Sequence, residues 1–545
     1  MLKDFVKHPF LLFENKNMNL PKLNLKSVLY ATLFGATVLF QQCEETEYIK
    51  PNIVFIMSDD HAYQAISAYG SKLIETPNID KIAEKGIIFN KAFVTNSICA
   101  PSRAVILTGI FSHLNGVPGN EQVFDGAQQT FPKILRQHGY QTAMIGKWHL
   151  KSHPTGFDYW NVLPGQGDYY NPDFISSGKD TTYEGYVTEI ITELSTSWLK
   201  NRDKDKPFCL MMHHKAPHRS WMPALKNLEL FDDKEFPLPA NFYDNYEGRE
   251  ALQKQMLTVK DHMDIRMDYK IPCNACDTVS VNHWAPGEYW RRLERLTPEE
   301  RQKWNEAYQK EEVEFFQVKD NEDKFDHWKY RRYMEDYLRC IVSVDESVGQ
   351  VLNFLQENGL EENTIVVYTS DQGFYLGEHG LFDKRFMYEE AMRTPLVIKF
   401  PPEIKENSQT DLLVQNLDIA PTLLHMAGIS VPAEMQGNSL RSIWQETDSK
   451  WRDALYYHYY EKGFGATPHY GIRTDRYKLI HFYDLIDSWE FYDLENDPLE
   501  MNNLMDNPEY QEVIDNLKIR LDKLQAQYKE TIHIDHNESN KYPSD

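Results

Sequence analysis

The sequence predicts an α/β protein with a large sheet and a smaller antiparallel sheet near the C-terminus. Residues 52–57 and 364–369 are short apolar runs rich in β-branched side chains, as expected for buried parallel strands. Residues 337–355 carry apolar side chains at helical spacing, which indicates a long amphipathic helix packed against a sheet. Strands that alternate with such helices favour the α/β class.

Two shorter helices are marked by the residues at their ends. Thr76-Pro77 and Gly86 bracket one predicted helix, and Thr130 and Gly139 bracket a second one. A proline is favoured in the first turn of a helix and a glycine just beyond the last turn. The first bracket contains both signals, and the second contains the glycine.

The chain of 545 residues is long enough for two domains, or for one large domain with an appendage. We expect the large α/β domain over 48–428, with a helical insertion rich in charge and tryptophan at 225–332. A C-terminal subdomain is expected over 429–535. It contains four runs with strand character followed by the helical stretch 517–528, which predicts a small antiparallel sheet covered by a helix.

The N-terminus is typical of an export signal. Residues 27–40 are apolar and uncharged, follow two lysines, and are too few to span a membrane. Cys43 then follows in a loose lipobox, which favours a lipid anchor, with simple cleavage or a retained anchor as alternatives. Residues 1–43 are therefore expected to be a signal, in an exported periplasmic or outer-membrane lipoprotein of a Gram-negative bacterium. Met18 is a more ordinary start, so an untranslated 1–17 is an alternative.

The net charge indicates which partners the chain can bind, and the cysteine content indicates which metal or redox sites it can form. The formal net charge of −24 argues against nucleic acid as a partner. Of the six cysteines, Cys273 and Cys276 form a C-x-x-C pair without the second pair that a zinc ribbon needs. A local disulfide or two free thiols is favoured there over a metal or redox site.

Acidic and amide side chains follow the two predicted parallel strands. Asp59 and Asp60 come after the first strand, and Asp371 and Gln372 come after the second. The carboxyl ends of such strands meet at one sheet edge, where α/β proteins bind ligands. Three carboxylates and an amide oxygen favour Ca²⁺ or Mg²⁺ over zinc. An Asp-Asp pair alone would more often be a helix cap or a turn.

The most specific motif is Cys99-Ala-Pro-Ser-Arg-Ala-Val-Ile-Leu-Thr-Gly109. It resembles the signature of the type I sulfatases, whose cysteine is oxidised after synthesis to formylglycine. The resemblance implies an alkaline-phosphatase-like fold, a large mixed sheet sandwiched by helices. It also implies a sulfated oligosaccharide as substrate and a formylglycine-generating or anaerobic sulfatase-maturing enzyme as partner. The aldehyde hydrate offers one hydroxyl to attack sulfur and a second to expel sulfate.

The other positions of the sulfatase pattern are also present. Asp59, Asp60, Asp371 and Gln372 match the metal ligands, although many members carry Asn at the last position. The metal is expected to be one Ca²⁺, with Mg²⁺ as an alternative, and the modified Cys99 completes the site. The remaining matches are the catalytic candidates Arg103, Lys147, His149, His218 and Lys384.

Each of these candidates has an implied role. If Cys99 opens a helix, Arg103 lies on the same face one turn later and meets the diol. Lys147 and Lys384 suit the nonbridging sulfate oxygens as point charges. His218 resembles the general acid that protonates the leaving alcohol, and His149 resembles the base that helps to expel sulfate. Strand alternation would place Lys147 and His149 on the same side.

Within the family the chain looks most like the N-acetylglucosamine-6-sulfatases that act exolytically on heparin and heparan sulfate. This likeness lies in the region 213–240 and in the overall layout. Four substrate contacts are expected outside the metal core: a stacking face from Trp221, and donors from Arg219, His469 and Arg473. His379 and Arg393 are further candidates near the site.

Three alternatives remain at this point. The substrate could be another sugar sulfate, such as galactose or N-acetylgalactosamine 6-sulfate. The same formylglycine chemistry also serves phosphonate and phosphate monoester hydrolases. A catalytically inactive binding protein is disfavoured, because no ligand or nucleophile position is lost.

Overall fold

The computed structural model describes residues 50–272, 287–447 and 450–531. The predicted signal with Cys43, and the Cys273–Cys276 pair, lie outside these residues. Among the described helices, none combines the length and the apolar character that crossing a bilayer requires.

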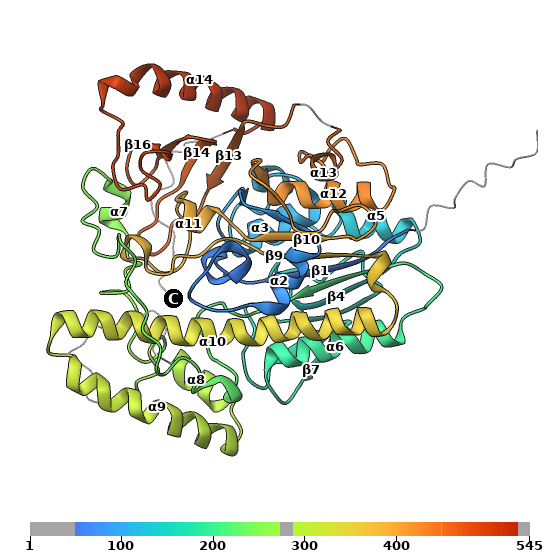
Figure 1. Cartoon of the computed structure of the whole chain (residues 1–545), viewed down its shortest axis with the longest axis horizontal. Helices are drawn as coiled ribbons and strands as arrows, with labels where there is room; N and C mark the ends of the chain where they lie inside the picture. The colour runs from blue at the N-terminus through green and yellow to red at the C-terminus, as the bar shows by residue number, and fades with distance from the viewer. Residues whose placement is uncertain (1–49, 273–286, 448–449, 532–545) are drawn as a thin grey trace, which may run out of the picture. The chain divides into compact units, whose positions relative to one another are not determined.

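The main sheet has ten strands in the order β11-β2-β10-β9-β1-β8-β4-β5-β6-β7 (Figure 1). Its central strands β9, β1, β8 and β4 are parallel. The strand bounds are β1 Asn52–Ser58, β2 Ile87–Phe89, β4 Gln141–Lys147, β5 Tyr159–Leu163, β6 Asp173–Ser176, β7 Lys179–Thr182, β8 Phe208–His213, β9 Thr364–Ser370, β10 Leu396–Lys399 and β11 Ser408–Thr410. The two predicted buried strands are therefore confirmed as neighbours.

Alternate side chains of β1 enter two separate apolar cores, one on each face of the sheet. Val54 and Ile56 face the helices α2 (Pro77–Glu84), α6 (Val187–Asn201) and α10 (Glu322–Glu357). Ile53, Phe55 and Met57 face α3, α5 and α12. Those three helices span Cys99–Thr108, Phe131–Gln137 and Ile419–Met426. A strand buried on both faces must be apolar throughout, which explains the continuous apolar run of β1.

The C-terminal sheet is a four-stranded antiparallel meander, as predicted. Its strands are β13 Ala454–Tyr459, β14 His469–Thr474, β15 Tyr477–Phe482 and β16 Ser488–Asp493. Helix α14 (Gln511–Tyr528) covers it, and its Leu517 and Leu521 share an apolar core with Ile472 of β14 (Figure 1). Val105 of α3 belongs to the same core, so this sheet is packed directly on the helix that Cys99 opens.

The remaining strands and α-helices of the described residues lie between or beside these elements. They are β3 Ala92–Phe93, β12 Val414–Gln415, α4 Ser112–Asn115, α7 Glu250–Lys254, α8 Glu288–Glu294, α9 Pro298–Val318, α11 Glu389–Met392 and α13 Arg441–Trp444.

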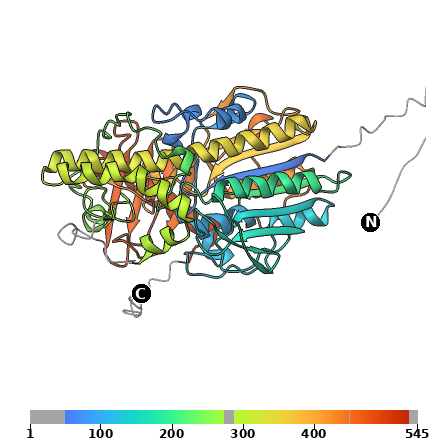
Figure 2. The ribbon, with the colours of Figure 1, turned by 90° about the horizontal axis from the view of Figure 1, so that it is seen from below.

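The helical insertion is continuous with the main helix layer. The expected helix at 337–355 extends back to Glu322, so the predicted insertion boundary at residue 332 falls inside α10. Figures 1 and 2 show this helix running along α6 at one end and along α9 at the other. The first part of α10 was not recognisable as a buried helix, because Arg332, Glu335 and Asp336 there are charged and yet fully buried.

These buried charges compensate one another. Arg332 Nη2 lies 3.0 Å from Asp336, its Nη1 pairs with Glu335, and its Nε lies 3.4 Å from Glu311 of α9. A buried charge is tolerated only when it is paired, so this cluster joins α9 to α10.

Arg332→Met should therefore destabilise the protein strongly, because it leaves buried carboxylates short of a partner. We expect a loss of about 3–5 kcal/mol, measured by chemical denaturation. Arg136→Met is the matched control, because Arg136 pairs with Asp158 at the surface and should contribute less than about 1 kcal/mol. If the two variants had similar midpoints of chemical denaturation, the structural role of the cluster would be contradicted.

Candidate active site

Four predicted ligand residues meet at the carboxyl edge of the main sheet. Strands β1 and β9 pair in register from Asn52–Thr364 to Ser58–Ser370, so the residues that follow both strands are neighbours. Carboxylate oxygens of Asp59, Asp60 and Asp371 lie within 4.8 Å of one another. The side chain of Gln372 joins them by donating from Nε2 to Asp60. All four residues are fully buried.

Cys99 points into this cluster from the first turn of α3. Its Sγ lies 3.3 Å from Asp59 Oδ1 and 3.7 Å from Gln372 Nε2. Cys99 is the first residue of α3, and the helix N-terminus favours negative charge at this point. Burial and the carboxylate of Asp59 raise the pKa of the thiol. An unmodified Cys99 is therefore a poor nucleophile, because the thiolate is the reactive form.

Three cations surround the carboxylates. Arg103 donates from Nε and Nη2 to Asp371 Oδ2, at 3.0 and 2.7 Å. The ammonium of Lys147 pairs with Asp59. Lys384 Nζ lies 2.7 Å from both carboxylate oxygens of Asp60. The site therefore offers three positive charges next to the cysteine, which suits an anionic substrate group.

The acidic cluster has the properties of a site for a hard cation. Burial raises the pKa of Asp60 to about 6 and that of Asp371 to about 7, and the charge of Asp59 adds to both effects. Burial also opposes ionisation of Asp59, but Lys147 leads the positive neighbours that hold its pKa well below the usual value. Oε1 of Gln372 is buried and has no hydrogen-bond partner among the described residues. Three carboxylates and a free amide oxygen fit a divalent metal.

The two predicted catalytic histidines also lie at the cluster. His218 Nε2 is 3.8 Å from Asp60 Oδ2, and its Nδ1 is 2.7 Å from the carbonyl oxygen of Arg219. His149 is half-buried, and burial and then the charge of Lys147 lower its pKa. The expectation that strand alternation aligns Lys147 with His149 is wrong. Strand β4 ends at Lys147, and the backbone at His149 turns to φ 56°.

The structure thus brings together every predicted metal and catalytic residue. These are Asp59, Asp60, Cys99, Arg103, Lys147, His149, His218, Asp371, Gln372 and Lys384. Their individual roles stay predictions.

Three of the predicted substrate contacts are buried side chains, and their contact with a substrate stays a prediction. Trp221 is fully buried and packs on Tyr333 at a centroid distance of 4.8 Å, so its ring has no free face for a sugar. His469 is fully buried among aromatic rings, 4.9 Å from that of Phe482. Arg473 is buried against Glu389 at 3.0 Å.

The other outlying candidates are engaged elsewhere. Arg219 directs Nε and Nη2 to the two carboxylate oxygens of Asp268, at 2.7 and 2.5 Å. His379 Nδ1 lies 2.7 Å from Asp244. Arg393 lies over the ring of Tyr63, 3.9 Å from its centroid.

Two residues that the sequence analysis missed flank Lys384. Asp383 and Arg385 are both buried apart from 8% of their surface, and both have positive φ angles, 75° and 101°. Strained backbone conformations of non-glycine residues cluster at active sites and ligand clamps. Arg385 Nη1 donates to the hydroxyl of Tyr459, 2.9 Å away on β13. The C-terminal sheet therefore forms one side of the site. In the sequence, the only signal for these two residues was the run of three consecutive charged residues, Asp383-Lys384-Arg385.

Gln166 is a further missed neighbour of the site. Its Oε1 accepts a hydrogen bond from Lys147 Nζ. No motif marks this residue, since it lies in a loop of glycine, proline and aspartate.

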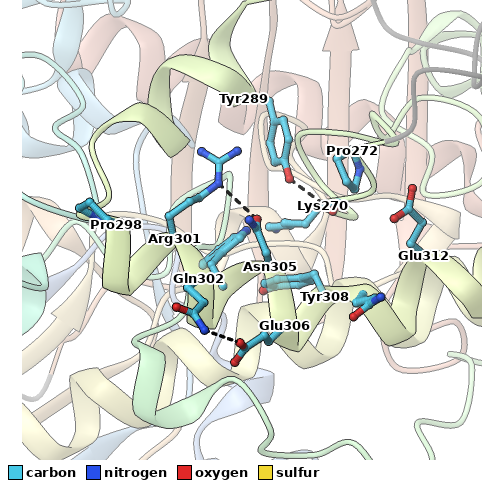
Figure 3. A pocket seen from close by; sticks show the side chains of 12 residues that line it. Lys270, Pro272, Tyr289, Pro298, Arg301, Gln302, Asn305, Glu306, Tyr308 and Glu312 are labelled. Atoms are coloured by element: carbon cyan, nitrogen blue, oxygen red, sulfur yellow. Dashed lines mark hydrogen bonds between the residues drawn. The ribbon is translucent and has the colours of Figure 1, made fainter.

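A cavity of about 660 Å³ lies in the helical insertion, outside the acidic cluster (Figure 3). Side chains of α8 and α9 form most of its wall, and Lys270 and Pro272 complete it.

Comparison with protein families agrees with this geometry. A family model described as sulfatase matches residues 51–429. The chain belongs to the sulfatase family. A second model, described as N-sulphoglucosamine sulphohydrolase, C-terminal, matches residues 377–527 and thus includes the C-terminal sheet. Sulfatases of this family generally use a formylglycine and a divalent metal.

Individual relatives narrow the comparison. The chain is 47% identical over 509 residues to an N-acetylglucosamine-6-O-sulfatase of Bacteroides thetaiotaomicron, covering 92% of this chain and 90% of that protein. The solved structure of BT4656 with its substrate D-glucosamine-2-N,6-O-disulfate has a TM-score of 0.85 at 47% identity, covering 89% of this chain and 99% of the other.

More distant structures show the fold alone. A phosphonate monoester hydrolase of Agrobacterium radiobacter has a TM-score of 0.64 at 19% identity, covering 88% of this chain and 96% of the other. The predicted alkaline-phosphatase-like fold is confirmed.

If the acidic cluster binds a divalent cation, chelation with EDTA should lower the thermal unfolding midpoint of the purified protein. A cation bound only by the folded chain contributes about 2.7 kcal/mol at 100 times its dissociation constant. Asp371→Asn should abolish the response, whereas Asp158→Asn, a change at an exposed carboxylate, should keep it. The same response in both variants would place the cation elsewhere.

Proposed function

We propose that this sulfatase removes 6-O-sulfate exolytically from glucosamine or N-acetylglucosamine of heparin- and heparan-type glycans. The observation that carries the sulfatase chemistry is the position of Cys99, at a helix N-terminus against Asp59 and within a ring of three cations. The 47% identical relatives support the choice of sugar, since one is an N-acetylglucosamine-6-O-sulfatase and BT4656 binds a 6-O-sulfated glucosamine.

We further propose one Ca²⁺ as the metal, with Mg²⁺ as the alternative. Asp59, Asp60, Asp371 and Gln372 would hold it together with the modified Cys99. A divalent ion there supplies positive charge that stabilises the sulfate oxygens. Several carboxylates in a buried oxygen cage favour Ca²⁺, because Mg²⁺ demands a tighter geometry and retains water.

In this mechanism the cations seat the substrate before the bond breaks. Arg103, Lys147 and Lys384 hold the nonbridging oxygens of the sulfate group. A formylglycine hydrate at position 99 would supply one hydroxyl that attacks sulfur and gives its proton to a carboxylate of the acidic cluster. The second hydroxyl would later expel sulfate, which leaves an aldehyde that water hydrates again. Because Cys99 is buried in the folded chain, we expect a maturing enzyme to act on it before folding is complete.

The two histidines would handle the protons. His218 donates a proton to the sugar oxygen as the S–O ester bond breaks, so the sugar leaves as a neutral alcohol. His149 accepts a proton from the second hydroxyl as sulfate departs. Burial lowers the pKa of His218, although the charge of Asp59 opposes that effect. A bound sulfate ester adds negative charge beside the ring and favours its protonated form.

Asp383 and Arg385 are our candidates for reading the sugar hydroxyls. They adjoin Lys384, and a carboxylate and a guanidinium together can accept and donate hydrogen bonds. Tyr459 of the C-terminal sheet stands behind Arg385, which favours a closed pocket and exolytic action.

We also propose that the protein is exported to the periplasm or, through a lipid on Cys43, to the outer membrane. The apolar run at 27–40 and the lipobox-like sequence before Cys43 support this.

Sulfate release from singly sulfated sugars tests the substrate directly. Glucosamine 6-sulfate and N-acetylglucosamine 6-sulfate should be cleaved at least about 10-fold faster than the two galacto 6-sulfates, because an inverted hydroxyl leaves a buried charged partner unpaired. Asp383→Asn should reduce this preference, whereas Asp158→Asn should not. Cys99→Ala should abolish turnover of every sugar. A preference for a galacto sugar would contradict the proposed substrate but not the sulfatase chemistry.

The leaving group tests the role of His218. His218→Ala should lower kcat/KM for the sugar sulfate by about 100-fold or more, since general acid catalysis contributes about 10²–10⁴. An aryl sulfate with a nitrophenolate leaving group needs little protonation and should lose far less. Equal losses on both substrates would instead assign His218 to sulfate binding.

A further inference from the structure

The dipeptide Arg219–Ser220, which directly follows His218, is held by three side chains from the helical insertion. Asp268 accepts two hydrogen bonds from the guanidinium of Arg219. Lys270 Nζ donates to the carbonyl oxygen of Ser220 at 2.7 Å, and Arg292 Nη1 donates to its hydroxyl at 2.8 Å. We call Asp268, Lys270 and Arg292 the 219–220 clamp.

The orientation of His218 depends on this dipeptide. Its Nδ1 lies 2.7 Å from the carbonyl oxygen of Arg219. A carbonyl can only accept, so Nδ1 carries a hydrogen and Nε2 is the nitrogen that faces Asp60, 3.8 Å away. The placement of one peptide carbonyl therefore sets both the ring orientation and the nitrogen that meets the substrate.

The clamp itself is anchored by buried charges. Lys270 Nζ also donates to the carbonyl oxygen of Asp268 at 2.8 Å and lies 3.2 Å from Asp336 of α10. Asp336 accepts a hydrogen bond from Tyr308 of α9 at 2.9 Å. Lys270, Asp268 and Asp336 are each at most 1% exposed, so no water competes for these bonds. Figure 3 shows Lys270 and Tyr308 at the wall of the insertion cavity.

We propose that Lys270, together with Asp268 and Arg292, is a positioning residue for the general acid His218. The helical insertion would thereby contribute to protonation of the leaving sugar without touching the substrate. This inference rests on the acid role given to His218 in the proposed function. It differs from that function in placing part of the catalytic geometry in α8 and in residues 264–272.

Lys270→Met tests the inference, because it keeps much of the side-chain volume and removes the hydrogen bonds. We expect kcat/KM for glucosamine 6-sulfate to fall about 10- to 100-fold, since misplacing a catalytic group by about 1 Å costs up to about 10²-fold. Turnover of 4-nitrophenyl sulfate, which needs little protonation, should fall less than about threefold. A purely structural role would reduce both rates alike.

Lys329→Met is the matched control. Lys329 is also a buried lysine of the insertion region, bonded to the carbonyl oxygen of Lys260, and no hydrogen bond or ion pair recorded for it reaches residues 218–221. Its substitution should change the two rates by the same factor. Should Lys270→Met fail to fold, Arg292→Met removes the bond to Ser220 from a side chain that is 13% exposed. It should show the same selective loss with a smaller amplitude.

The outcomes separate the inference from the function on which it rests. Equal losses on both substrates in Lys270→Met, alongside a selective loss in His218→Ala, would overturn the inference alone. Equal losses in His218→Ala would overturn the acid role and the inference with it. A wild-type enzyme that cleaves the aryl sulfate and no glucosamine sulfate would contradict the proposed substrate. Selective losses in Lys270→Met and His218→Ala, with none in Lys329→Met, would support the clamp.

Discussion

The in-register pairing of β1 with β9 is the constraint on which the site depends. Because the two strands end at the same level, Asp59 and Asp371 emerge side by side at the sheet edge. A shift of one residue would turn alternate side chains to the opposite face and disturb both apolar cores. The cores on the two faces of β1 therefore fix the positions of the carboxylates, which in turn place the partners of Cys99.

The second requirement is that buried charges balance one another, and it applies in two separate clusters. At the site, three buried carboxylates face Arg103, Lys147 and Lys384. In the insertion, Arg332 and Lys270 compensate the acids of α9 and α10. Ions this deeply buried are stable only as complete sets, so removal of one member affects all the others. The two clusters differ in purpose, because only the first retains a buried amide oxygen without a partner.

Sequence patterns predicted the parts governed by local or periodic rules. The strands β1 and β9 followed from apolar runs, and so did the meeting of Asp59, Asp60, Asp371 and Gln372 at one sheet edge. Burial of polar side chains was not predictable, because it depends on partners distant in the chain. Trp221 and Arg473 were therefore expected at the substrate, and α10 up to residue 332 was assigned to the insertion. Asp383 and Arg385 were missed because a positive φ angle leaves no periodic pattern in the sequence.

Two different parts of the chain position the groups proposed to act at sulfur and the group proposed to act on the leaving sugar. On the sulfur side, Asp59, Lys147 and Asp371 are placed by the ends of the central strands, and Cys99 and Arg103 by α3. The leaving-group side is different, because His218 stands on a loop beyond β8 and the sheet does not orient its ring. A loop alone would leave the imidazole free to rotate. The carbonyl of Arg219 removes that freedom, and Lys270 of the insertion holds the next carbonyl along the chain, that of Ser220. With His218 as the proposed general acid, an insertion remote from sulfur would thus influence how well the sugar departs.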